Sequence, residues 1–257
     1  MSDIHPTAIV SKKAELADDV VVGPYAIIED KVVVGSGSQV ASAALLASGT
    51  ILGKGVRIHH GAVIGTQPQD LKFGGEITTA EIGDNTIVRE YATVNRGTVY
   101  HNKTTIGRNC MLMAYSHVAH DCIIGDNVII ANSVNLAGHI DIGDYAIIGG
   151  VVPVHQFVRI GAHAMIGGGF RVQQDVCPYA LVAGYPLRVI GINLTGLKRR
   201  GFSSKVLRTL ESVYKILFFS KLNTSQALER IKTEVEIIPE VQLIIDFIET
   251  STRGFIK

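Results

Sequence analysis

Aliphatic residues recur at every sixth position over most of this chain. Beginning at Ile4, eleven consecutive positions of the series are aliphatic, and this first run ends at Ile64. The series resumes in the same phase for three positions from Ile82 and for twelve positions from Ile106 to Val172. Neither a 3.6-residue helix nor an alternating strand has this period, so the pattern predicts short strands separated by bends. Stacked copies of such a unit form a solenoid with a continuous aliphatic core.

The residues that follow each aliphatic position support the same unit. The next residue is glycine eleven times, which indicates a backbone bend that disfavours a side chain. The fourth residue after the aliphatic one is mostly alanine or serine, and small side chains would let neighbouring layers approach closely. The composition agrees, because 47% hydrophobic residues, only 6% aromatic residues and 27 glycines suit short strands and tight turns better than a helical globule.

Two interruptions, at residues 65–80 and 95–105, leave the phase of the repeat unchanged. We therefore expect loops that leave the solenoid and return to the same face. The first loop is polar and carries Gln69-Asp70-Leu71-Lys72 ahead of paired glycines. Loops on a rigid scaffold often carry function, and an insertion without function is the alternative.

The repeat then stops, and residues 176–257 predict a small helical domain that covers the open end of the solenoid. Three helices are expected there from the spacing of apolar residues. They are residues 203–220, residues 224–237 with Thr224 as the cap, and a helix that begins at Pro239.

Charge is nearly balanced over the whole chain, with a formal net charge of +1, so no general affinity for nucleic acid is expected. Residues 186–221, however, contain eight basic residues and one acid, Glu211. Such a region indicates an acidic partner or phosphates, and a solvated helix face is the alternative. The basic residues are Arg188, Lys198, Arg199, Arg200, Lys205, Arg208, Lys215 and Lys221.

The three cysteines form no Cys-x-x-Cys pair, which indicates reduced thiols in a cytoplasmic protein. The first residues lack a basic region followed by an apolar run, so no signal peptide is expected. No apolar run approaches the roughly 20 residues of a membrane span, so no membrane-spanning segment is expected either.

The repeat of aliphatic, glycine, two variable residues, a small residue and one variable residue resembles the hexapeptide-repeat acyltransferases. The resemblance covers residues 4 to about 175. It implies a mainly β fold, a left-handed parallel β-helix of triangular section over residues 1–175, with three hexapeptides in each coil and usually three chains in the assembly. Residues 176–257 would be the C-terminal α-helical domain.

Residues one coil apart should then lie above one another at roughly the 4.8 Å spacing of paired strands. His120, Gly138 and Gln156 would form one column, and Asp121, His139 and Phe157 the next. A histidine can accept a proton from a hydroxyl, and a backbone N–H can stabilise the oxyanion of a tetrahedral intermediate. Asp121 could orient the imidazole, so this corner predicts acyl transfer.

Three other interpretations compete with acyl transfer. Each histidine alone is more often a surface side chain. His117, His120 and His139 could also bind zinc, since some hexapeptide-repeat proteins are carbonic anhydrases with three histidines. A solenoid can be purely structural, although the loops and the asymmetric histidines argue against this.

Several motifs together are similar to those of the UDP-N-acetylglucosamine O-acyltransferase family of the lipid A pathway. The resemblance spans the whole chain. It implies transfer of an (R)-3-hydroxyacyl group from the phosphopantetheine arm of acyl carrier protein to the 3-hydroxyl of UDP-N-acetylglucosamine, with no metal and no resident cofactor. The motifs are Gln69-Asp70-Leu71-Lys72, His117-Val118-Ala119-His120-Asp121, Leu136-Ala137-Gly138-His139, Val154-His155-Gln156-Phe157 and the segment from Asn193 to Phe202.

The resemblance also implies roles for individual residues. His120 would be the general base, Asp121 its supporting carboxylate and the Gly138 N–H the oxyanion donor. The site would lie between neighbouring prisms of a homotrimer, and acyl carrier protein would bind the basic C-terminal region. Substrate-binding residues would be Gln69, Asp70, Lys72, His117, His139, His155 and Gln156 for the sugar and pantetheine, and Asn193, Arg199 and Arg200 for the uridine diphosphate.

Two positions qualify the resemblance. Thr195 stands where some relatives carry an acid, and Gly168 falls in the region linked to acyl-chain length, where a glycine suggests a longer chain. An N-acyltransferase of the same fold is an alternative, but it carries an extra N-terminal domain whereas the repeat here begins at Ile4. A non-enzymatic scaffold is another, and the acceptor could carry a 3-hydroxyl or a 3-amine.

Overall fold

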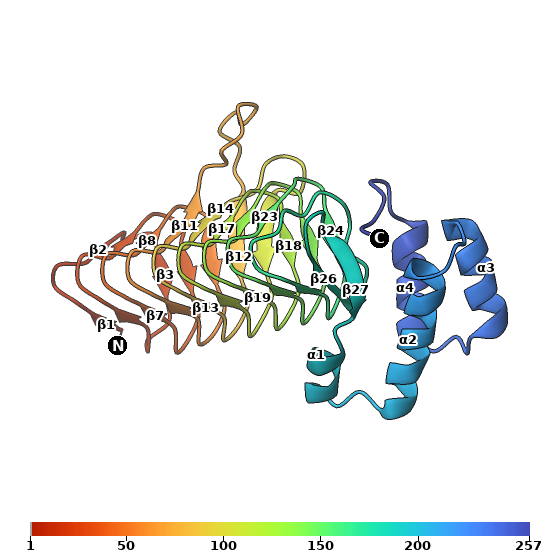
Figure 1. Cartoon of the computed structure of the whole chain (residues 1–257). Coiled ribbons are helices and arrows are strands. Elements are labelled where there is room, and N and C mark those ends of the chain that lie inside the picture. The colour runs from red at the N-terminus through yellow and green to blue at the C-terminus, as the bar shows by residue number, and fades with distance from the viewer. Residues whose placement is uncertain (1) are drawn as a thin grey trace.

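Short parallel strands form a three-sided prism in the computed structural model, which describes residues 2–257 (Figure 1). Met1, the first residue of the expected β-helix domain, lies outside the described residues.

We call the three sheets faces A, B and C. Face A contains β1 Asp3–Ile4, β4 Val21–Val22, β7 Gln39–Val40, β10 Arg57–Ile58, β13 Ile87–Val88, β16 Met111–Leu112, β19 Ile129–Ile130, β22 Ile147–Ile148, β25 Met165–Ile166, β26 Ala180–Ala183 and β27 Arg188–Ile192. Face B contains β2 Ile9–Val10, β5 Ile27–Ile28, β8 Leu45–Leu46, β11 Val63–Thr66, β14 Thr93–Asn95, β17 His117–Val118, β20 Asn135–Leu136 and β23 Pro153–Val154. Face C contains β3 Glu15–Leu16, β6 Val33–Val34, β9 Thr50–Leu52, β12 Thr79–Ile82, β15 Lys103–Ile106, β18 Ile123–Ile124, β21 Asp141–Ile142 and β24 Arg159–Ile160.

The strand register confirms the expected coil. Val118 pairs with Leu136, the residue 18 positions later, and Leu136 pairs in turn with Val154. The predicted aliphatic series points into the prism, and all its members from Val22 to Val172 are at most 3% exposed. The core is therefore a continuous column of aliphatic side chains, as the period predicts.

From Tyr25 onward, most corners of the prism turn through a left-handed residue, the third after the aliphatic one. Asp121 and His139, for example, have φ of 58° and 62°. The glycine directly after the aliphatic residue has a different function from the one its pattern suggested. A Cβ on Gly83 would lie 2.7 Å from the carbonyl carbon of Gly107 in the next coil. These glycines are thus required by the close approach of stacked backbones, not by the bend.

Both interruptions leave the prism at the same corner, where face B passes into face C. Their loops are Gln67–Thr78, which projects at the top of Figure 1, and Arg96–Asn102. The chain returns from each loop in register, since Ile64 pairs with Val94 and Val94 pairs with Val118. Both loops therefore leave the solenoid and rejoin it on the same faces.

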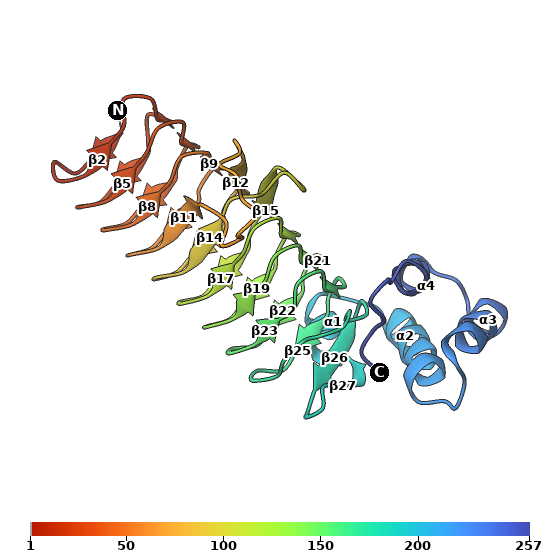
Figure 2. The ribbon, with the colours of Figure 1, turned by 90° about the horizontal axis from the view of Figure 1, so that it is seen from above.

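The last coil extends beyond the expected division at residue 176. Strand β26 continues face A in parallel with β25, and β27 turns back antiparallel to β26. The division at residue 176 therefore cuts through sheet, and the first helix begins at Leu194. Figure 2 shows α2, α3 and α4 gathered beyond the C-terminal end of the prism. The helices are α1 Leu194–Arg199, α2 Ser204–Phe218, α3 Thr224–Glu234 and α4 Pro239–Glu249.

Details of the helices differ from the sequence expectations in two places. The short helix α1 was not expected. Asn223, not Thr224, caps α3, and it forms a capping box with Gln226. Within residues 2–257, no helix is both long enough and apolar enough to cross a bilayer.

We predict that Gly83→Ala destabilises the prism by on the order of 1–3 kcal/mol, because the new methyl group must push two backbones apart. Thermal unfolding followed by circular dichroism measures this effect. Gly74→Ala is the matched control, since its Cβ would meet nothing nearer than a Glu76 carboxylate oxygen at 4.0 Å. Equal melting temperatures for the two variants would contradict the close-approach argument.

Candidate active site

The corner between faces B and C brings the predicted catalytic residues together. A Cβ on Gly138 would lie 2.7 Å from Nε2 of His120, so the imidazole lies directly over this glycine. The backbone N–H of His139 donates to the His120 carbonyl at 3.0 Å, and that of Phe157 donates to the Gly138 carbonyl at 3.2 Å. The predicted columns are therefore present, and glycine is required at position 138 because the His120 ring occupies the place of a side chain.

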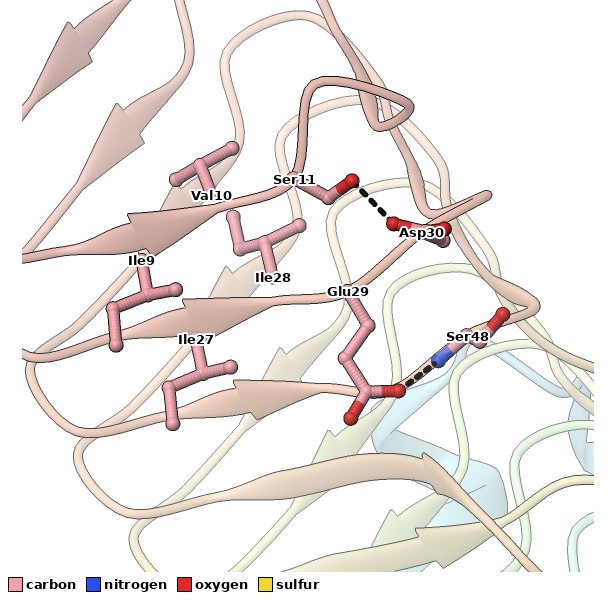
Figure 3. A pocket seen from close by; sticks show the side chains of 8 residues that line it. All are labelled: Ile9, Val10, Ser11, Ile27, Ile28, Glu29, Asp30 and Ser48. Atoms are coloured by element: carbon pink, nitrogen blue, oxygen red, sulfur yellow. Dashed lines mark hydrogen bonds between the residues drawn. The ribbon is translucent and has the colours of Figure 1, made fainter.

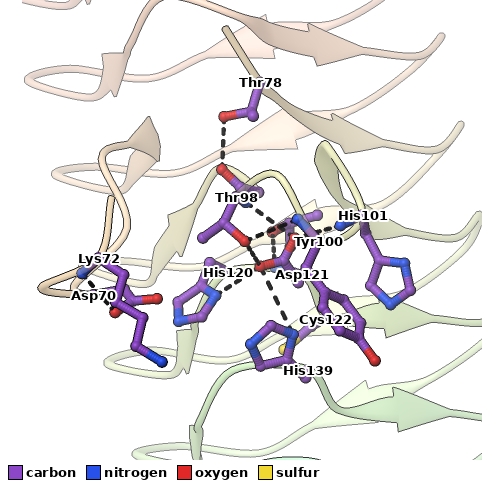
Figure 4. A network of polar contacts seen from close by, with 12 residues as sticks. Asp70, Lys72, Thr78, Thr98, Tyr100, His101, His120, Asp121, Cys122 and His139 are labelled. Carbon is purple, nitrogen blue, oxygen red and sulfur yellow. Dashed lines mark hydrogen bonds and ion pairs between the residues drawn. The ribbon is translucent and has the colours of Figure 1, made fainter. Parts of the chain in front are cut away.

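His120 and Asp121 form a buried pair (Figure 4). Nδ1 of His120 lies 2.8 Å from Oδ2 of Asp121, and the carboxylate is 0% exposed. The backbone N–H groups of Thr98 and His101 and the Thr98 hydroxyl also donate to this carboxylate, at 3.0, 3.1 and 2.7 Å. An ionised carboxylate only accepts hydrogen bonds, so Nδ1 carries the proton and Nε2 of the neutral ring is left as an acceptor.

The electrostatic balance favours the ionised form of Asp121 and the neutral forms of His117 and His139. Burial alone would raise the pKa of Asp121, but hydrogen bonds from Thr98, from His120 and from the N–H groups outweigh it and hold the pKa below its ordinary value. Burial lowers the pKa of His117 and also that of His139. At neutral pH the corner therefore contains one carboxylate and neutral neighbouring imidazoles.

Aromatic rings line the corner beside the pair. His139 stacks on Phe157 with centroids 4.4 Å apart, and Tyr100 meets the His139 ring edge-on at 4.6 Å. His139 also meets His120 edge-on at 4.9 Å, while its Nδ1 is 3.8 Å from the Asp121 carboxylate. These contacts fix the His139 ring next to the His120 ring.

The Gly138 N–H belongs to a set of backbone donors that recurs at each corner. At the corner between faces C and A, the equivalent N–H groups of Lys54, Arg108 and Asp126 bind carboxylate oxygens at 2.7, 2.7 and 2.8 Å. No residue in 2–257 accepts a hydrogen bond from the Gly138 N–H. The fold thus directs this class of N–H toward anionic oxygens, and at Gly138 the donor is free beside the histidine.

The other predicted residues of this corner have varied surroundings. Asp70 and Lys72 lie in the Gln67–Thr78 loop, and Figure 4 shows them on the His120 side of the corner. His117 lies in β17, with Nδ1 2.7 Å from the Thr93 hydroxyl. Gln69 and Gln156 are exposed.

Two further predicted residues lie at other positions of the last coils. His155 contacts the Gln156 carbonyl at 3.0 Å and Arg253 at 3.2 Å. Gly168 is exposed at a different corner, between faces A and B, where its nearest neighbours are backbone atoms of Gly150.

The predicted nucleotide-binding residues lie at yet another corner, between faces C and A. Asn193 is 7% exposed, caps α1 through Gly196 and donates to the His163 carbonyl at 3.0 Å. Arg200 donates to the Tyr145 carbonyl at 3.0 Å, and Arg199 is exposed on α1. In Figure 1, α1 and the Gln67–Thr78 loop lie on opposite sides of the prism. A single chain therefore does not bring these residues to His120.

Thr98 and Tyr100 were not predicted as site residues. Both lie in the Arg96–Asn102 loop, whose conformation does not follow the hexapeptide repeat. The sequence offered one signal for this loop, because the phase of the six-residue repeat places it one coil before Asp121. Which loop residues contact the Asp121 carboxylate is known only from the structure.

The zinc alternative is weakened by the contacts of the only suitable group found in the described residues. Ligand atoms of His120, Asp121 and His139 all lie within 4.8 Å of one another. However, the Asp121 carboxylate already accepts four hydrogen bonds, including the one from His120 Nδ1. His117, the third histidine of that hypothesis, is not in the group.

A separate groove of about 470 Å³ opens on the N-terminal coils and has different chemistry (Figure 3). Its walls include Ile9 and Ile27, and its carboxylates are already engaged by Ser11 and by the backbone N–H of Ser48. The groove lacks a histidine, so the histidine corner is the better candidate for catalysis.

Comparisons with known proteins agree along the whole chain. A model described as UDP N-acetylglucosamine O-acyltransferase, domain 2, matches residues 175–256, and a bacterial transferase hexapeptide model matches residues 103–138. Acyl-[acyl-carrier-protein]–UDP-N-acetylglucosamine O-acyltransferases are similar to this chain: that of Trichlorobacter lovleyi is 53% identical, with 99% of both chains covered, and that of Thermodesulfovibrio yellowstonii is 45% identical, with both chains fully covered.

A solved structure extends the similarity to the fold. The crystal structure of a UDP-N-acetylglucosamine acyltransferase from Bacteroides fragilis is 44% identical, covers 99% of this chain and 100% of its own, and superimposes with a TM-score of 0.98. The expected left-handed parallel β-helix with C-terminal helices is thereby confirmed.

We predict that the purified protein contains substoichiometric zinc and keeps its melting temperature after dialysis against EDTA. The reason is that the Asp121 carboxylate already accepts four hydrogen bonds and His117 lies outside the group, so fewer free ligand atoms remain than a zinc site requires. Elemental analysis and differential scanning calorimetry test this. One zinc per chain, lost together with thermal stability on chelation, would restore the metal hypothesis.

Proposed function

The chain belongs to the UDP-N-acetylglucosamine O-acyltransferase family, and we propose that it transfers an (R)-3-hydroxyacyl group from acyl carrier protein to the 3-hydroxyl of UDP-N-acetylglucosamine. This reaction is the first step of lipid A synthesis. The observation that carries the proposal is the buried His120–Asp121 pair beside the free Gly138 N–H. The names of relatives similar over the full length support the substrates.

The proposed reaction assigns one step to each group. Nε2 of His120 takes the proton of the sugar hydroxyl while that oxygen attacks the thioester carbonyl. The Gly138 N–H donates to the oxygen that becomes negative in the tetrahedral intermediate. When the intermediate collapses, the C–S bond breaks and the pantetheine sulfur receives the proton from His120. Asp121 stabilises the transient imidazolium, so the cycle closes without a resident cofactor or metal.

Charged and polar side chains around the corner are proposed to hold the substrates. Lys72 and Asp70 extend from the loop near His120, and His139 meets the His120 ring edge-on. His117 lies three residues before His120, and Gln156 lies one coil beyond Gly138 in the same column. These groups would bind the sugar and the pantetheine end. We keep Gln69 and His155 as further candidates for substrate contact, and Gly168 for the region that limits acyl length.

A homotrimer would complete the site. Asn193, Arg199 and Arg200 lie at the corner between faces C and A, away from His120 in the same chain. Neighbouring prisms would place this corner of one chain against the histidine corner of the next, where the two arginines could meet a diphosphate. This arrangement would make an isolated chain inactive.

The proposed partner and location follow from charge and from the thiols. Apart from Arg200, which is half-buried and donates to the Tyr145 carbonyl, the basic residues at positions 186–221 are exposed. One of the exposed residues, Lys205, also forms an ion pair with Glu236. These basic residues would attract acyl carrier protein, which is acidic. All three cysteines are free and buried, which supports a reducing cytoplasmic location.

We predict that His120→Ala lowers turnover by on the order of 10²–10⁴-fold while melting temperature and assembly stay normal, because only the base is removed. The assay offers UDP-N-acetylglucosamine with a ladder of 3-hydroxyacyl carrier proteins and identifies the product by mass. His5→Ala, an exposed histidine of the first coil, is the control. Near-normal transfer by His120→Ala would rule out the proposed base.

We also predict that two inactive variants restore each other. If His120 acts with Arg199 of a neighbouring chain, mixing His120→Ala and Arg199→Ala chains in equal amounts leaves about a quarter of the sites with both residues intact. Chains are unfolded together, refolded and assayed against each variant refolded alone. Activity in the mixture no greater than in the separate variants would contradict a site shared between chains.

A further inference from the structure

Asp121 cannot contact substrate, because its carboxylate is 0% exposed and all its contacts are internal. Its influence on the reaction must therefore pass through His120. The orientation of the carboxylate then depends on the groups that donate hydrogen bonds to it on the side opposite the imidazole. That side is formed entirely by the Arg96–Asn102 loop.

Thr98 contributes two of the four hydrogen bonds to this carboxylate. Its N–H donates to Oδ1 at 3.0 Å, and its hydroxyl donates to Oδ2 at 2.7 Å. Oδ2 is the same oxygen that binds His120 Nδ1 at 2.8 Å. The hydroxyl therefore shares an acceptor atom with the imidazole and fixes the direction from which that oxygen meets the ring.

The direction of the Thr98 hydroxyl is itself determined by its neighbours. The backbone N–H of Tyr100 donates to this oxygen at 3.2 Å, so the hydroxyl proton is left to point at Asp121. Thr98 is 6% exposed, which excludes exchange of this bond with bulk water.

The loop is anchored to the prism on both sides of Thr98. The Thr78 hydroxyl donates to the Gly97 carbonyl at 2.6 Å, and the Gly97 N–H donates to Thr79 at 3.1 Å. On the other side, the Thr79 N–H donates to the Asn102 carbonyl at 3.1 Å, and within the loop the Asn102 N–H donates to the Thr98 carbonyl at 2.7 Å. The donors of Thr98 are therefore preorganised, and they do not need to be ordered by Asp121.

We propose that Thr98 is a positioning residue for the acyl transfer, acting through Asp121 on the tautomer and orientation of His120. The proposal rests on the function proposed above and assigns a role to the second interruption of the repeat. The Arg96–Asn102 loop serves to deliver Thr98, and with it the His101 N–H, to the carboxylate. Thr98 itself does not touch the reacting atoms.

The test compares Thr98→Val, which keeps the shape and the N–H but removes the hydroxyl, with Thr98→Ser, which keeps the hydroxyl. We expect Thr98→Val to lower kcat by on the order of 10- to 100-fold, the usual effect of losing one hydrogen bond to a charged group. KM values for both substrates should change by less than about twofold, because substrate contacts are intact. Thr98→Ser should keep most of the activity.

The pH profile separates positioning from a merely structural role. The Thr98 hydrogen bonds help to lower the pKa of Asp121, so their partial loss makes this carboxyl take up a proton at higher pH. The acid limb of kcat/KM should therefore move to higher pH in Thr98→Val. It should stay in place in Thr98→Ser.

Thr86→Val is a matched control. The Thr86 hydroxyl is also buried, donates to one acceptor, the Gly107 carbonyl at 2.8 Å, and accepts one backbone N–H, that of Cys110 at 3.1 Å. It contacts no residue of the histidine corner. Loss of stability should be similar in the two valine variants, but the loss of kcat and the shifted acid limb should occur only in Thr98→Val.

Three outcomes overturn the proposal: unchanged kcat in Thr98→Val, a fall in kcat with an unmoved acid limb, or the same fall in Thr86→Val. If Thr98→Val fails to assemble, Thr98→Ala provides the same comparison with less steric demand. His120→Ala is assayed in parallel. An active His120→Ala refutes the proposed base, whereas an inactive His120→Ala with a normal Thr98→Val refutes only the role of Thr98.

Discussion

Parallel pairing of the hexapeptide strands at an offset of 18 residues, extended to 24 or 30 only where a loop intervenes, is the constraint on which this molecule depends. Because Val118 pairs with Leu136 and Leu136 with Val154, every position of the repeat recurs directly above its copy. Aliphatic side chains at one position then form the core, and polar side chains at the corner positions form columns on the outside. His120 meets Gly138 because of this register, not because of a loop that folds over it. A shift of one residue would separate the imidazole from the backbone N–H below it.

The same constraint explains how much could be predicted from the sequence. The six-residue period predicted a solenoid of short strands and bends. The resemblance to the hexapeptide-repeat acyltransferases added the triangular section and the 18-residue coil, and from that coil followed the columns of His120 and Asp121. The period was not enough for features that depart from it. The hydrogen bonds from Thr98 and His101 to Asp121 depend on the conformation of a nonperiodic loop. The helix α1, the Asn223 cap and the strands beyond residue 176 likewise depend on local packing at the end of the solenoid.

The sequence predicted which residues form the site, but it did not predict which corner of the prism the nucleotide-binding residues occupy. Counting in steps of 18 relates His120 to Gln156, but it does not relate either of them to Asn193, which follows the last coil. The structure places Asn193 beside the His163 carbonyl, at a corner formed by different faces. One chain therefore carries two separate surfaces. One holds the residues expected to bind the nucleotide, and the other holds the residues expected to transfer the proton. The triangular section makes such a division natural, because each corner points in a different direction.

The histidine corner differs from the corner between faces C and A in its backbone hydrogen bonds. At the histidine corner, the outward N–H of Gly138 has no acceptor within residues 2–257. At the corner between faces C and A, aspartates in adjacent coils bind the outward N–H groups, as Asp144 binds Asp126. Those N–H groups are therefore satisfied within the chain and are not available to an external oxygen. At the corner between faces B and C, the acid is Asp121, one residue later in the repeat, and its left-handed backbone turns the carboxylate toward Thr98 and His120. The Gly138 N–H has no such acceptor, because the equivalent residue in the following coil is Gln156 and not an acid. This corner thus combines the buried His120–Asp121 pair with a backbone donor that no residue in 2–257 binds, while the stacked core beneath it is the same as at the other corners.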